Sequence, residues 1–261
     1  MRAVLSSLKP YVRLARSALA SSPVSCDPSL RRKSLYLGAT LIHLDLTQQA
    51  TGGLTFVNLH ENEQTSVQAA KALLAREPGR LIELHAGGRR LVTFRIGLRA
   101  YTVDPNRIFT DPGLAATLQS LGQDSDDART AVRGLRDAVL GLLPPPNGRP
   151  VVALHNNAGA DYSMEQYRRG GSCAGDAAQV HESGSMTDNE FFVVTDRELF
   201  EPLAAEDFNV VLQSESAFDD GSLSIWAGQV GRRYINVEAR EGRSAQQARM
   251  LDAVVRCFGS P

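Results

Sequence analysis

Short apolar runs of strand length alternate with segments of helical periodicity along most of this 261-residue chain. Strands are predicted at residues 54–59, 150–154, 190–195, 208–213 and 234–239. Apolar side chains that recur three or four positions apart predict helices at residues 65–75, 124–143, 197–205 and 244–257. This alternation of strands and helices predicts a single α/β domain, with a mainly parallel or mixed twisted sheet and helices on both faces.

Two segments of the first hundred residues carry a different pattern. Residues 34–44 predict a strand or a strand pair. Residues 80–85 and 91–96 are both strand-like and are separated by Gly87-Gly88, so they predict a hairpin that turns at these glycines.

The N-terminal residues 1–33 are predicted to form an amphipathic segment that packs on a catalytic domain of residues 34–261. Pro10, Arg13 and Arg16 interrupt the apolar stretch that a secretory signal needs, which favours a cytoplasmic location. No apolar run is long enough to cross a bilayer. We therefore expect no membrane span.

Composition excludes some classes of partner. The chain is 43% hydrophobic and 22% charged with a formal net charge of -1, which gives no support for nucleic-acid binding. Its three cysteines, Cys26, Cys173 and Cys257, form no C-x-x-C pair and do not indicate a disulfide framework. A thiol enzyme that uses Cys173 with His181 is one alternative hypothesis.

His60 and Glu63 follow the predicted strand at residues 54–59 and precede a predicted helix. A histidine and a carboxylate three positions apart at a strand end can both turn toward one point. Imidazole nitrogen and carboxylate oxygen are ligands of catalytic zinc, which keeps a position open for water. The pair therefore predicts two ligands of a metal site, although a short H-x-x-E match also arises by chance.

His155 ends the apolar strand at residues 150–154 and opens a long polar segment, residues 156–188. Because ligands in α/β sheets bind at the carboxyl ends of strands, His155 is placed to be a third metal ligand. A histidine satisfied by the backbone is the alternative. The segment that follows has the length of a lid or binding loop.

Polar side chains elsewhere suggest substrate and proton chemistry. Asn106 and Arg107 can hold a substrate carboxylate, because guanidinium makes two parallel bonds to it. Arg99 can stabilise the oxyanion that forms when water attacks an amide carbonyl. Glu238, near the end of the strand at residues 234–239, can serve as the general base. Solvated arginines and a surface acid are the alternatives for these positions.

These motifs occur in the order His-x-x-Glu, Arg, Asn-Arg, His and Glu. This order resembles the zinc carboxypeptidase superfamily, which includes the M14 carboxypeptidases and the succinylglutamate desuccinylase/aspartoacylase branch. Residues 99–109 resemble the Arg…Asp-Leu-Asn-Arg-x-Phe segment of that branch, with Pro105 in place of its leucine, and residues 154–156 resemble its Leu-His-Asn. The resemblance covers about residues 54–243.

The resemblance implies a zinc carboxypeptidase-like fold and one Zn²⁺ per chain. It implies roles for seven residues: zinc ligation by His60, Glu63 and His155, oxyanion contact by Arg99, carboxylate binding by Asn106 and Arg107, and general-base catalysis by Glu238. Carboxypeptidases also place a tyrosine in a loop that caps the substrate, and the candidates are Tyr162, Tyr167 and Tyr234.

The leading hypothesis is a metallohydrolase that cleaves an amide bond beside a free carboxylate. The deacylase branch has a β-domain after its catalytic glutamate, whereas only a closing helix follows Glu238 here. This favours carboxypeptidase-type cleavage of a small peptide, with a bacterial cell-wall peptide as one substrate that the resemblance implies. The alternatives are an N-acyl-amino-acid deacylase and a metal-containing protein that binds carboxylate ligands without turnover.

Overall fold

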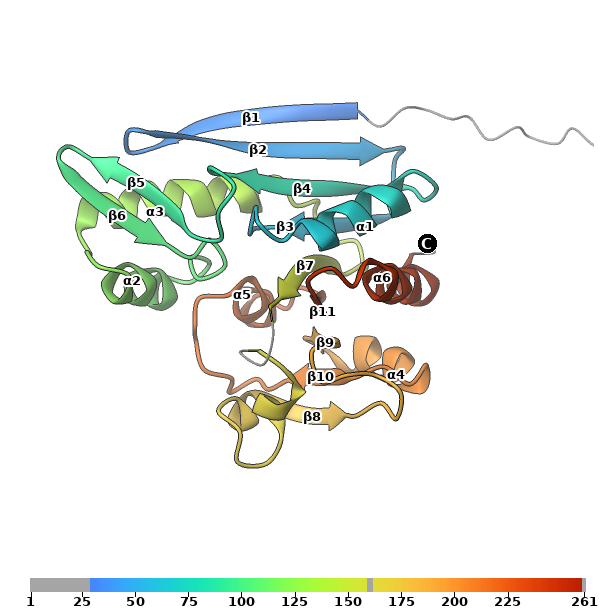
Figure 1. Cartoon of the computed structure of the whole chain (residues 1–261). Helices are drawn as coiled ribbons and strands as arrows, with labels where there is room; N and C mark the ends of the chain where they lie inside the picture. The colour runs from blue at the N-terminus through green and yellow to red at the C-terminus, as the bar shows by residue number, and fades with distance from the viewer. Residues whose placement is uncertain (1–28, 159–161, 260–261) are drawn as a thin grey trace, which may run out of the picture.

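A computed structural model describes residues 29–158 and 162–259. Its main element is a nine-stranded sheet in the order β1-β2-β4-β3-β7-β11-β9-β10-β8 (Figure 1). The strands are β1 (Ser29–Leu37), β2 (Thr40–Gln49), β3 (Leu54–Asn58), β4 (Gly79–His85), β7 (Val151–Asn157), β8 (Ala177–His181), β9 (Phe191–Val194), β10 (Val210–Gln213) and β11 (Tyr234–Arg240).

The sheet is mixed, with a parallel centre. Strands β4, β3, β7 and β11 run parallel to one another. On one side β2 joins β4 antiparallel, and on the other side β9 joins β11 antiparallel. The parallel centre is buried on both faces, as β3 and β7 show by having no exposed residue.

Helices cover both faces of the sheet (Figure 1). One core cluster joins Val152 and Leu154 of β7 to α1 (Gln64–Leu74), α4 (Arg197–Ala205) and α6 (Ser244–Phe258). The other joins Val151 and Ala153 to α2 (Asp111–Ser120), α3 (Asp126–Leu140) and α5 (Leu223–Gln229). Successive β7 side chains point to opposite faces, so the strand contributes to both cores. The predicted α/β architecture is confirmed.

The predicted hairpin of residues 80–85 and 91–96 is wrong. Strand β4 lies inside the main sheet between β2 and β3, whereas β5 (Val92–Ile96) pairs with β6 (Arg99–Val103) in a separate two-stranded sheet. Four consecutive residues of β4 are buried, while β5 alternates between buried and exposed positions. The turn that forms a hairpin is at Gly97, whose φ of 58° suits a tight two-residue loop.

Other segments refine the predictions. Residues 34–44 belong to an antiparallel pair, β1 and β2. Residues 156–188 are not one loop, because β7 extends through Asn157 and β8 forms an edge strand of the sheet. This stretch also holds the short 3-10 helices Met164–Tyr167 and Ala174–Asp176. Helices α2 and α5 were not predicted.

The expected N-terminal segment falls largely outside the described residues, since residues 29–33 already belong to β1.

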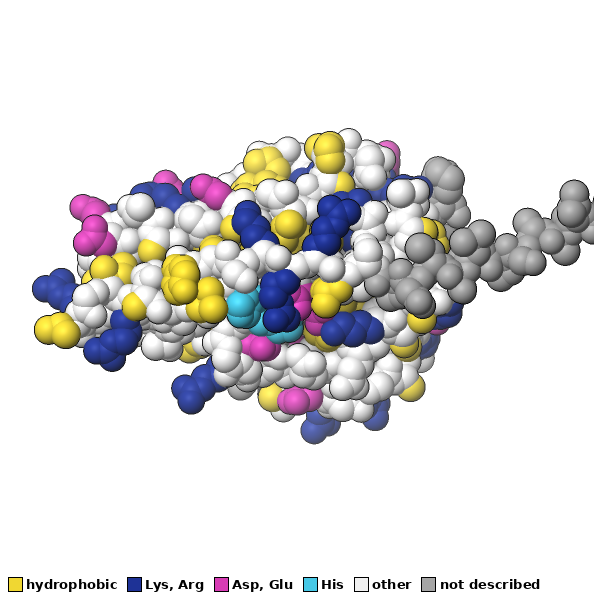
Figure 2. All heavy atoms as spheres, turned by 90° about the horizontal axis from the view of Figure 1, so that it is seen from above, with side chains coloured by type: hydrophobic (Ala, Val, Ile, Leu, Met, Phe, Trp, Pro, Cys, Tyr) yellow, Lys and Arg dark blue, Asp and Glu magenta, His cyan; other side chains and the backbone are white. Residues whose placement is uncertain are grey.

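Figure 2 views the molecule from above and shows basic, acidic and histidine side chains gathered on this face. On β1 and its neighbours, Arg32 donates to both carboxylate oxygens of Asp45, and His85 Nε2 lies 3.5 Å from Asp45 Oδ2. Charged side chains on an edge strand discourage pairing with another chain. None of the described helices has the length and hydropathy needed to cross a membrane.

The sheet register brings the chemistry-bearing residues together. Glu238 on β11 lies directly beside His155 on β7. Strand β3, the other neighbour of β7, ends at Asn58, two residues before His60. The carboxyl ends of these three parallel strands therefore form the floor on which the candidate site is built.

Candidate metal and substrate site

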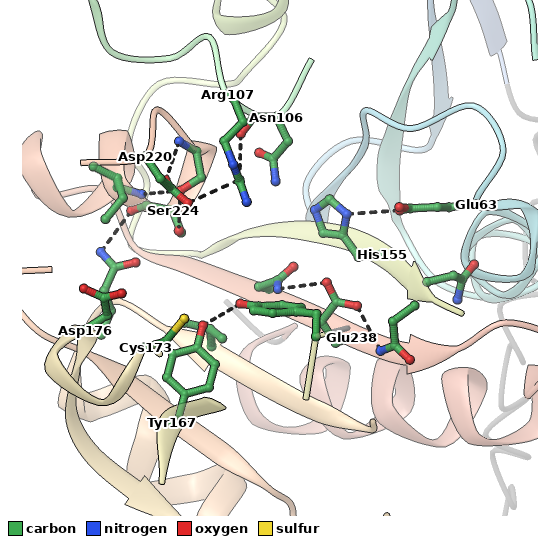
Figure 3. Close-up of a pocket in the computed structure, with 18 of the residues that line it drawn as sticks. Glu63, Asn106, Arg107, His155, Tyr167, Cys173, Asp176, Asp220, Ser224 and Glu238 are labelled. Carbon is green, nitrogen blue, oxygen red and sulfur yellow. Dashed lines mark hydrogen bonds and ion pairs between the residues drawn. The ribbon is translucent and has the colours of Figure 1, made fainter. Parts of the chain in front are cut away.

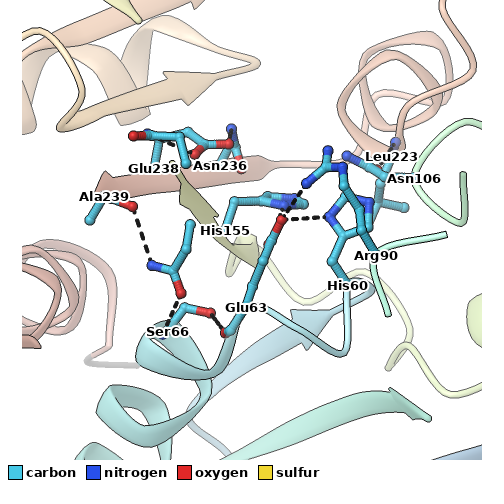
Figure 4. Close-up of polar contacts among 12 residues, drawn as sticks. His60, Glu63, Ser66, Arg90, Asn106, His155, Leu223, Asn236, Glu238 and Ala239 are labelled. Atoms are coloured by element: carbon cyan, nitrogen blue, oxygen red, sulfur yellow. Dashed lines mark hydrogen bonds and ion pairs between the residues drawn. The ribbon is translucent and has the colours of Figure 1, made fainter. Parts of the chain in front are cut away.

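His60 and Glu63 lie in the turn between β3 and α1. The backbone N–H of Glu63 donates to the carbonyl of His60 at 3.0 Å, and Ser66 Oγ donates to the carbonyl of Glu63 at 2.7 Å. Glu63 immediately precedes the helix but makes no capping bond with its side chain. Instead, its carboxylate turns toward His60 and His155 (Figure 4).

His60, Glu63 and His155 converge in the interior. Their potential ligand atoms lie within 4.8 Å of one another, and the three residues are at most 4% exposed. His155 Nδ1 lies 3.0 Å from Glu63 Oε2 in a hydrogen bond. His60 Nδ1 lies 2.9 Å from Glu63 Oε1, yet it has no aligned hydrogen-bond partner among the described residues. The structure thus brings together all three ligands that the sequence predicted.

This donor set fits a divalent metal ion. Two imidazole rings and one carboxylate are a usual protein ligand set of catalytic zinc. The unpartnered nitrogen of His60 faces the same carboxylate as His155 does, which is the arrangement expected when an ion completes the bonding. These three residues would hold the metal.

Asp104 fixes the orientation of His60. Its Oδ1 lies 2.8 Å from His60 Nε2, so the other ring nitrogen faces Glu63. Burial alone would lower the pKa of His60, but the neighbouring carboxylates of Asp104 and Glu63 outweigh it and raise the pKa to about 8. A carboxylate behind a ligating imidazole sets its tautomer and increases its basicity. Asp104 lies within the motif of residues 99–109, but the sequence alone does not indicate this role.

Arg90 is the second contact that sequence analysis missed. Its Nη1 donates to Glu63 Oε1 at 2.6 Å, and its Nη2 lies 3.8 Å from Asp104 Oδ2 (Figure 4). The loop that carries Arg90 is anchored by Glu61, which accepts hydrogen bonds from the backbone N–H groups of Ala86 and Gly88. Arg90 follows an irregular glycine-containing loop, so no periodicity marked it.

Arg99 is not brought to this site. It opens β6 beside the Gly97-Leu98 turn, where Leu98 is 94% exposed. Arg99 is itself exposed, and it is not among the residues that line the cavity next to His155. The placement follows from the pairing of β5 with β6, which sequence analysis did not anticipate.

A cavity of about 540 Å³ opens beside two of the three candidate ligands, Glu63 and His155 (Figure 3). Asn106 and Arg107 line it together with Glu63, His155 and Glu238. Asn106 is held on both sides, because its N–H donates to Asp104 Oδ1 at 2.8 Å and its Oδ1 accepts from the N–H of Leu223 at 3.1 Å. The predicted carboxylate-binding pair therefore faces the same space as the candidate metal ligands.

Glu238 lies on the cavity floor and is 5% exposed. Burial, reinforced by the charge of Glu63, raises the pKa of Glu238 despite the opposing effect of His155. Asn157 Nδ2 donates to its Oε2 at 3.3 Å, and Asn236 Nδ2 donates to its Oε1 at 3.5 Å. A buried carboxylate with a raised pKa accepts a proton more readily than an exposed glutamate does.

The three candidate tyrosines, Tyr162, Tyr167 and Tyr234, all line the cavity. The hydroxyls of Tyr162 and Tyr167 are hydrogen-bonded to each other, and burial raises the pKa of each phenol. Cys173 also lines the cavity. His181, at the end of β8, instead lies near Asp207, with its Nε2 3.9 Å from Asp207 Oδ1. The described contacts therefore do not form the Cys173–His181 pair of the thiol hypothesis.

Fold and site together define an α/β protein with a candidate metal centre at the carboxyl ends of its parallel strands. No family model matches the chain, and no curated protein matches it. Several solved structures do. The succinylglutamate desuccinylase/aspartoacylase from Rhodobacter sphaeroides is 13% identical with a TM-score of 0.44, over 88% of this chain and 65% of that one. This chain thus spans less than two thirds of that protein.

A succinylglutamate desuccinylase from Silicibacter sp. is 15% identical with a TM-score of 0.44, over 91% of this chain and 69% of that one. The murein-tripeptide amidase MpaA from Escherichia coli O157 is 12% identical with a TM-score of 0.45, over 87% of this chain and 92% of that one.

Proposed function

We propose that this protein is a zinc-dependent hydrolase that cleaves an amide bond next to a free carboxylate, in the manner of a carboxypeptidase. The observation that carries the proposal is the content of one cavity. Glu63 and His155 line it and converge with the buried His60, Glu238 lies buried on its floor, and Arg107 faces the same space.

The metal would be held by His60, Glu63 and His155. Bound zinc supplies a Lewis acid that lowers the pKa of water and polarises a carbonyl. Asp104 keeps the His60 ring turned toward Glu63 through its 2.8 Å contact with Nε2. The deeply buried triad also excludes bulk water from the ligands.

Glu238 is the group that moves the proton. Its carboxylate accepts a proton from the attacking water and then donates it to the leaving amine. The raised pKa supports this assignment, because a general base works best when its pKa approaches the operating pH. Asn157 and Asn236 orient the carboxylate by donating to one oxygen each.

Arg107 and Asn106 orient the substrate by its carboxylate. Arg107 is 38% exposed and lines the cavity, so its guanidinium is accessible to a ligand. We assign stabilisation of the developing oxyanion to Arg90 rather than Arg99. The support is its direct contact with Glu63, which places a cation beside the reacting centre.

Zinc content and turnover test the proposal. The purified protein should carry about one zinc per chain, and His60→Ala should lose it, whereas the matched control His43→Ala should retain it. Glu238→Gln should keep zinc but lose roughly 10²–10⁴-fold in kcat. Full zinc occupancy in His60→Ala, or near-normal turnover by Glu238→Gln, would contradict the assigned roles.

An N-acyl-amino-acid deacylase would use the same residues and differ only in the acyl group. Assays of C-terminal dipeptides against N-acyl amino acids separate the two reactions by their kcat/KM. Zinc-loaded protein that binds these carboxylates but turns over none would instead indicate the carboxylate-binding protein. The buried Glu238 argues against that case, since simple binding of an anion gains nothing from a nearby acid.

A further inference from the structure

The end of the cavity beyond Arg107 is acidic. Asp176 and Asp220 lie there, on the opposite side of the cavity from Glu63 and His155 (Figure 3). Among the described residues that line the cavity, the only Lys or Arg side chains are Arg90 and Arg107, and Arg90 is paired with Glu63. Of these two arginines, Arg107 is the one that contacts an aspartate of the acidic end, Asp220.

Binding of a substrate carboxylate changes this charge balance. Arg107 Nη1 lies 3.4 Å from Asp220 Oδ2, so the two side chains neutralise each other before substrate arrives. Asp176 accepts a hydrogen bond from the N–H of Phe218 at 2.8 Å and forms no ion pair within the described chain. When a carboxylate engages Arg107, that carboxylate and Asp220 share one guanidinium, so a cationic group on the ligand would restore the charge balance.

The side-chain amides of two buried asparagines independently indicate a ligand that carries hydrogen-bond donors. Asn236 is 7% exposed, and its Nδ2 points to Glu238, which leaves Oδ1 turned the other way. Asn157 is 9% exposed, and its Nδ2 donates to the carbonyl of Asn189 and to Glu238. Neither Oδ1 meets a donor among the described residues, although both side chains line the cavity. A buried acceptor left unpaired is costly, so these two atoms are available to accept from N–H groups of a ligand.

Asn236 stands on the path between the two ends of the cavity. Tyr234, Asn236 and Glu238 alternate along β11 and share one face of the sheet. The charges of both Glu238 and Asp220 act on the Tyr234 phenol, whose pKa is raised mainly by burial. A ligand that extends from the candidate metal ligands toward Asp220 therefore passes Asn236.

We propose that the cavity selects substrates whose carboxyl-bearing residue also carries a cationic side chain, an ammonium or guanidinium group as in lysine, ornithine or arginine. Asp176 and Asp220 receive the cation, and Asn236 Oδ1 accepts from a substrate N–H. This inference rests on the proposed function, because it takes Arg107 as the carboxylate site. The same acidic end disfavours a leaving residue with an acidic side chain, since like charges oppose each other.

Binding of free amino acids tests the selectivity without any need for turnover. Calorimetric titration of the zinc-loaded protein should show L-lysine binding roughly 10–100-fold more tightly than L-norleucine, which has the same aliphatic chain without the ammonium group, because a hydrogen bond to a charged group contributes about 1.5–3 kcal/mol. L-Glutamate should bind more weakly than either.

Variants assign this preference to the aspartates. Asp176→Asn keeps an oxygen that can accept from Phe218 N–H but removes the charge, so the lysine-to-norleucine ratio should fall toward one. Asp220→Asn should lower the ratio as well, and the exposed control Glu198→Gln on α4 should keep it. Equal binding of lysine and norleucine by the unaltered protein, or an unchanged ratio in both aspartate variants, would overturn the inference.

Blocked dipeptides that end in lysine, norleucine or glutamate separate this inference from the proposed function. Cleavage with the highest kcat/KM for lysine supports both. Cleavage without preference, or with preference for glutamate, overturns the inference and leaves the hydrolase intact. No cleavage of any dipeptide, together with selective lysine binding, overturns the carboxypeptidase-type activity and keeps the cationic subsite.

Discussion

At the scale of single residues, Glu238 is held where ionisation is unfavourable. It is 5% exposed, and burial is the main reason why its pKa is raised. A raised pKa in the folded state means that the acid stabilises the fold while protonated. This contribution is present below the pKa of the unfolded chain and is lost as the pH rises through the folded pKa.

Glu238→Gln should therefore stabilise the metal-free protein at neutral and alkaline pH, because glutamine has a similar shape and cannot ionise. Its melting temperature should exceed that of the unaltered protein at pH 8, and the difference should shrink as the pH falls below about 4.3, the pKa of glutamate in the unfolded chain. Thermal unfolding in the presence of a chelator measures this. A difference that is independent of pH would show that the charge of Glu238 is not the cause.

The residues of the site differed in how readily the sequence revealed them. His60, Glu63 and His155 were predicted correctly as a converging group, because each stands at or just after the carboxyl end of a recognisable strand. Arg90 was missed, since its position depends on backbone contacts between Glu61 and the loop after β4. The exposed position of Arg99 on β6 depends on strand pairing, which sequence periodicity does not specify.

At the scale of elements, most of the sheet was predictable because buried parallel strands are continuous apolar runs. The pairing partner of β4 was not. A strand that pairs on both sides and a strand of a hairpin have similar local composition. Only the long-range pairing of β4 with β2 and β3 distinguishes the two cases. Helix α5 was missed because its seven residues are too few to show a clear helical period.

Two hairpin glycines give a matched test of how the small β5–β6 sheet docks on the β1–β2 turn. Gly38 and Gly97 have φ values of 57° and 58°. A Cβ on Gly38 would lie 2.1 Å from the carbonyl oxygen of Arg95, whereas a Cβ on Gly97 would meet nothing within 4 Å. Gly97→Ala should therefore cost only the left-handed backbone penalty, roughly 1–2 kcal/mol.

Gly38→Ala should cost clearly more than Gly97→Ala, because the Arg95 backbone must move and the 2.7 Å bond from Ala39 N–H to its carbonyl oxygen is disturbed. Urea denaturation of both variants gives the two free energies of unfolding. Similar losses would indicate that β5 does not pack closely against the β1–β2 turn.

At the scale of the whole molecule, the candidate metal ligands join distant parts of the chain. His60 and Glu63 flank the turn between β3 and α1, and His155 lies 92 residues beyond Glu63 on β7. An ion that binds all three ties two neighbouring central strands to a helix. Because it binds the folded state alone, it should stabilise the fold by mass action, by about 2.7 kcal/mol at a free concentration 100 times its Kd.

Zinc should accordingly raise the melting temperature of the chelator-treated protein, with a shift that grows with zinc concentration. His155→Ala should abolish most of this shift, because one of the three converging ligands is lost. His43→Ala is the matched control, since His43 contacts Ser34 at the β1–β2 edge and should leave the shift unchanged. Equal shifts in both variants would mean that zinc binds elsewhere, whereas loss in His155→Ala alone locates the stabilising ion at the carboxyl ends of the central strands.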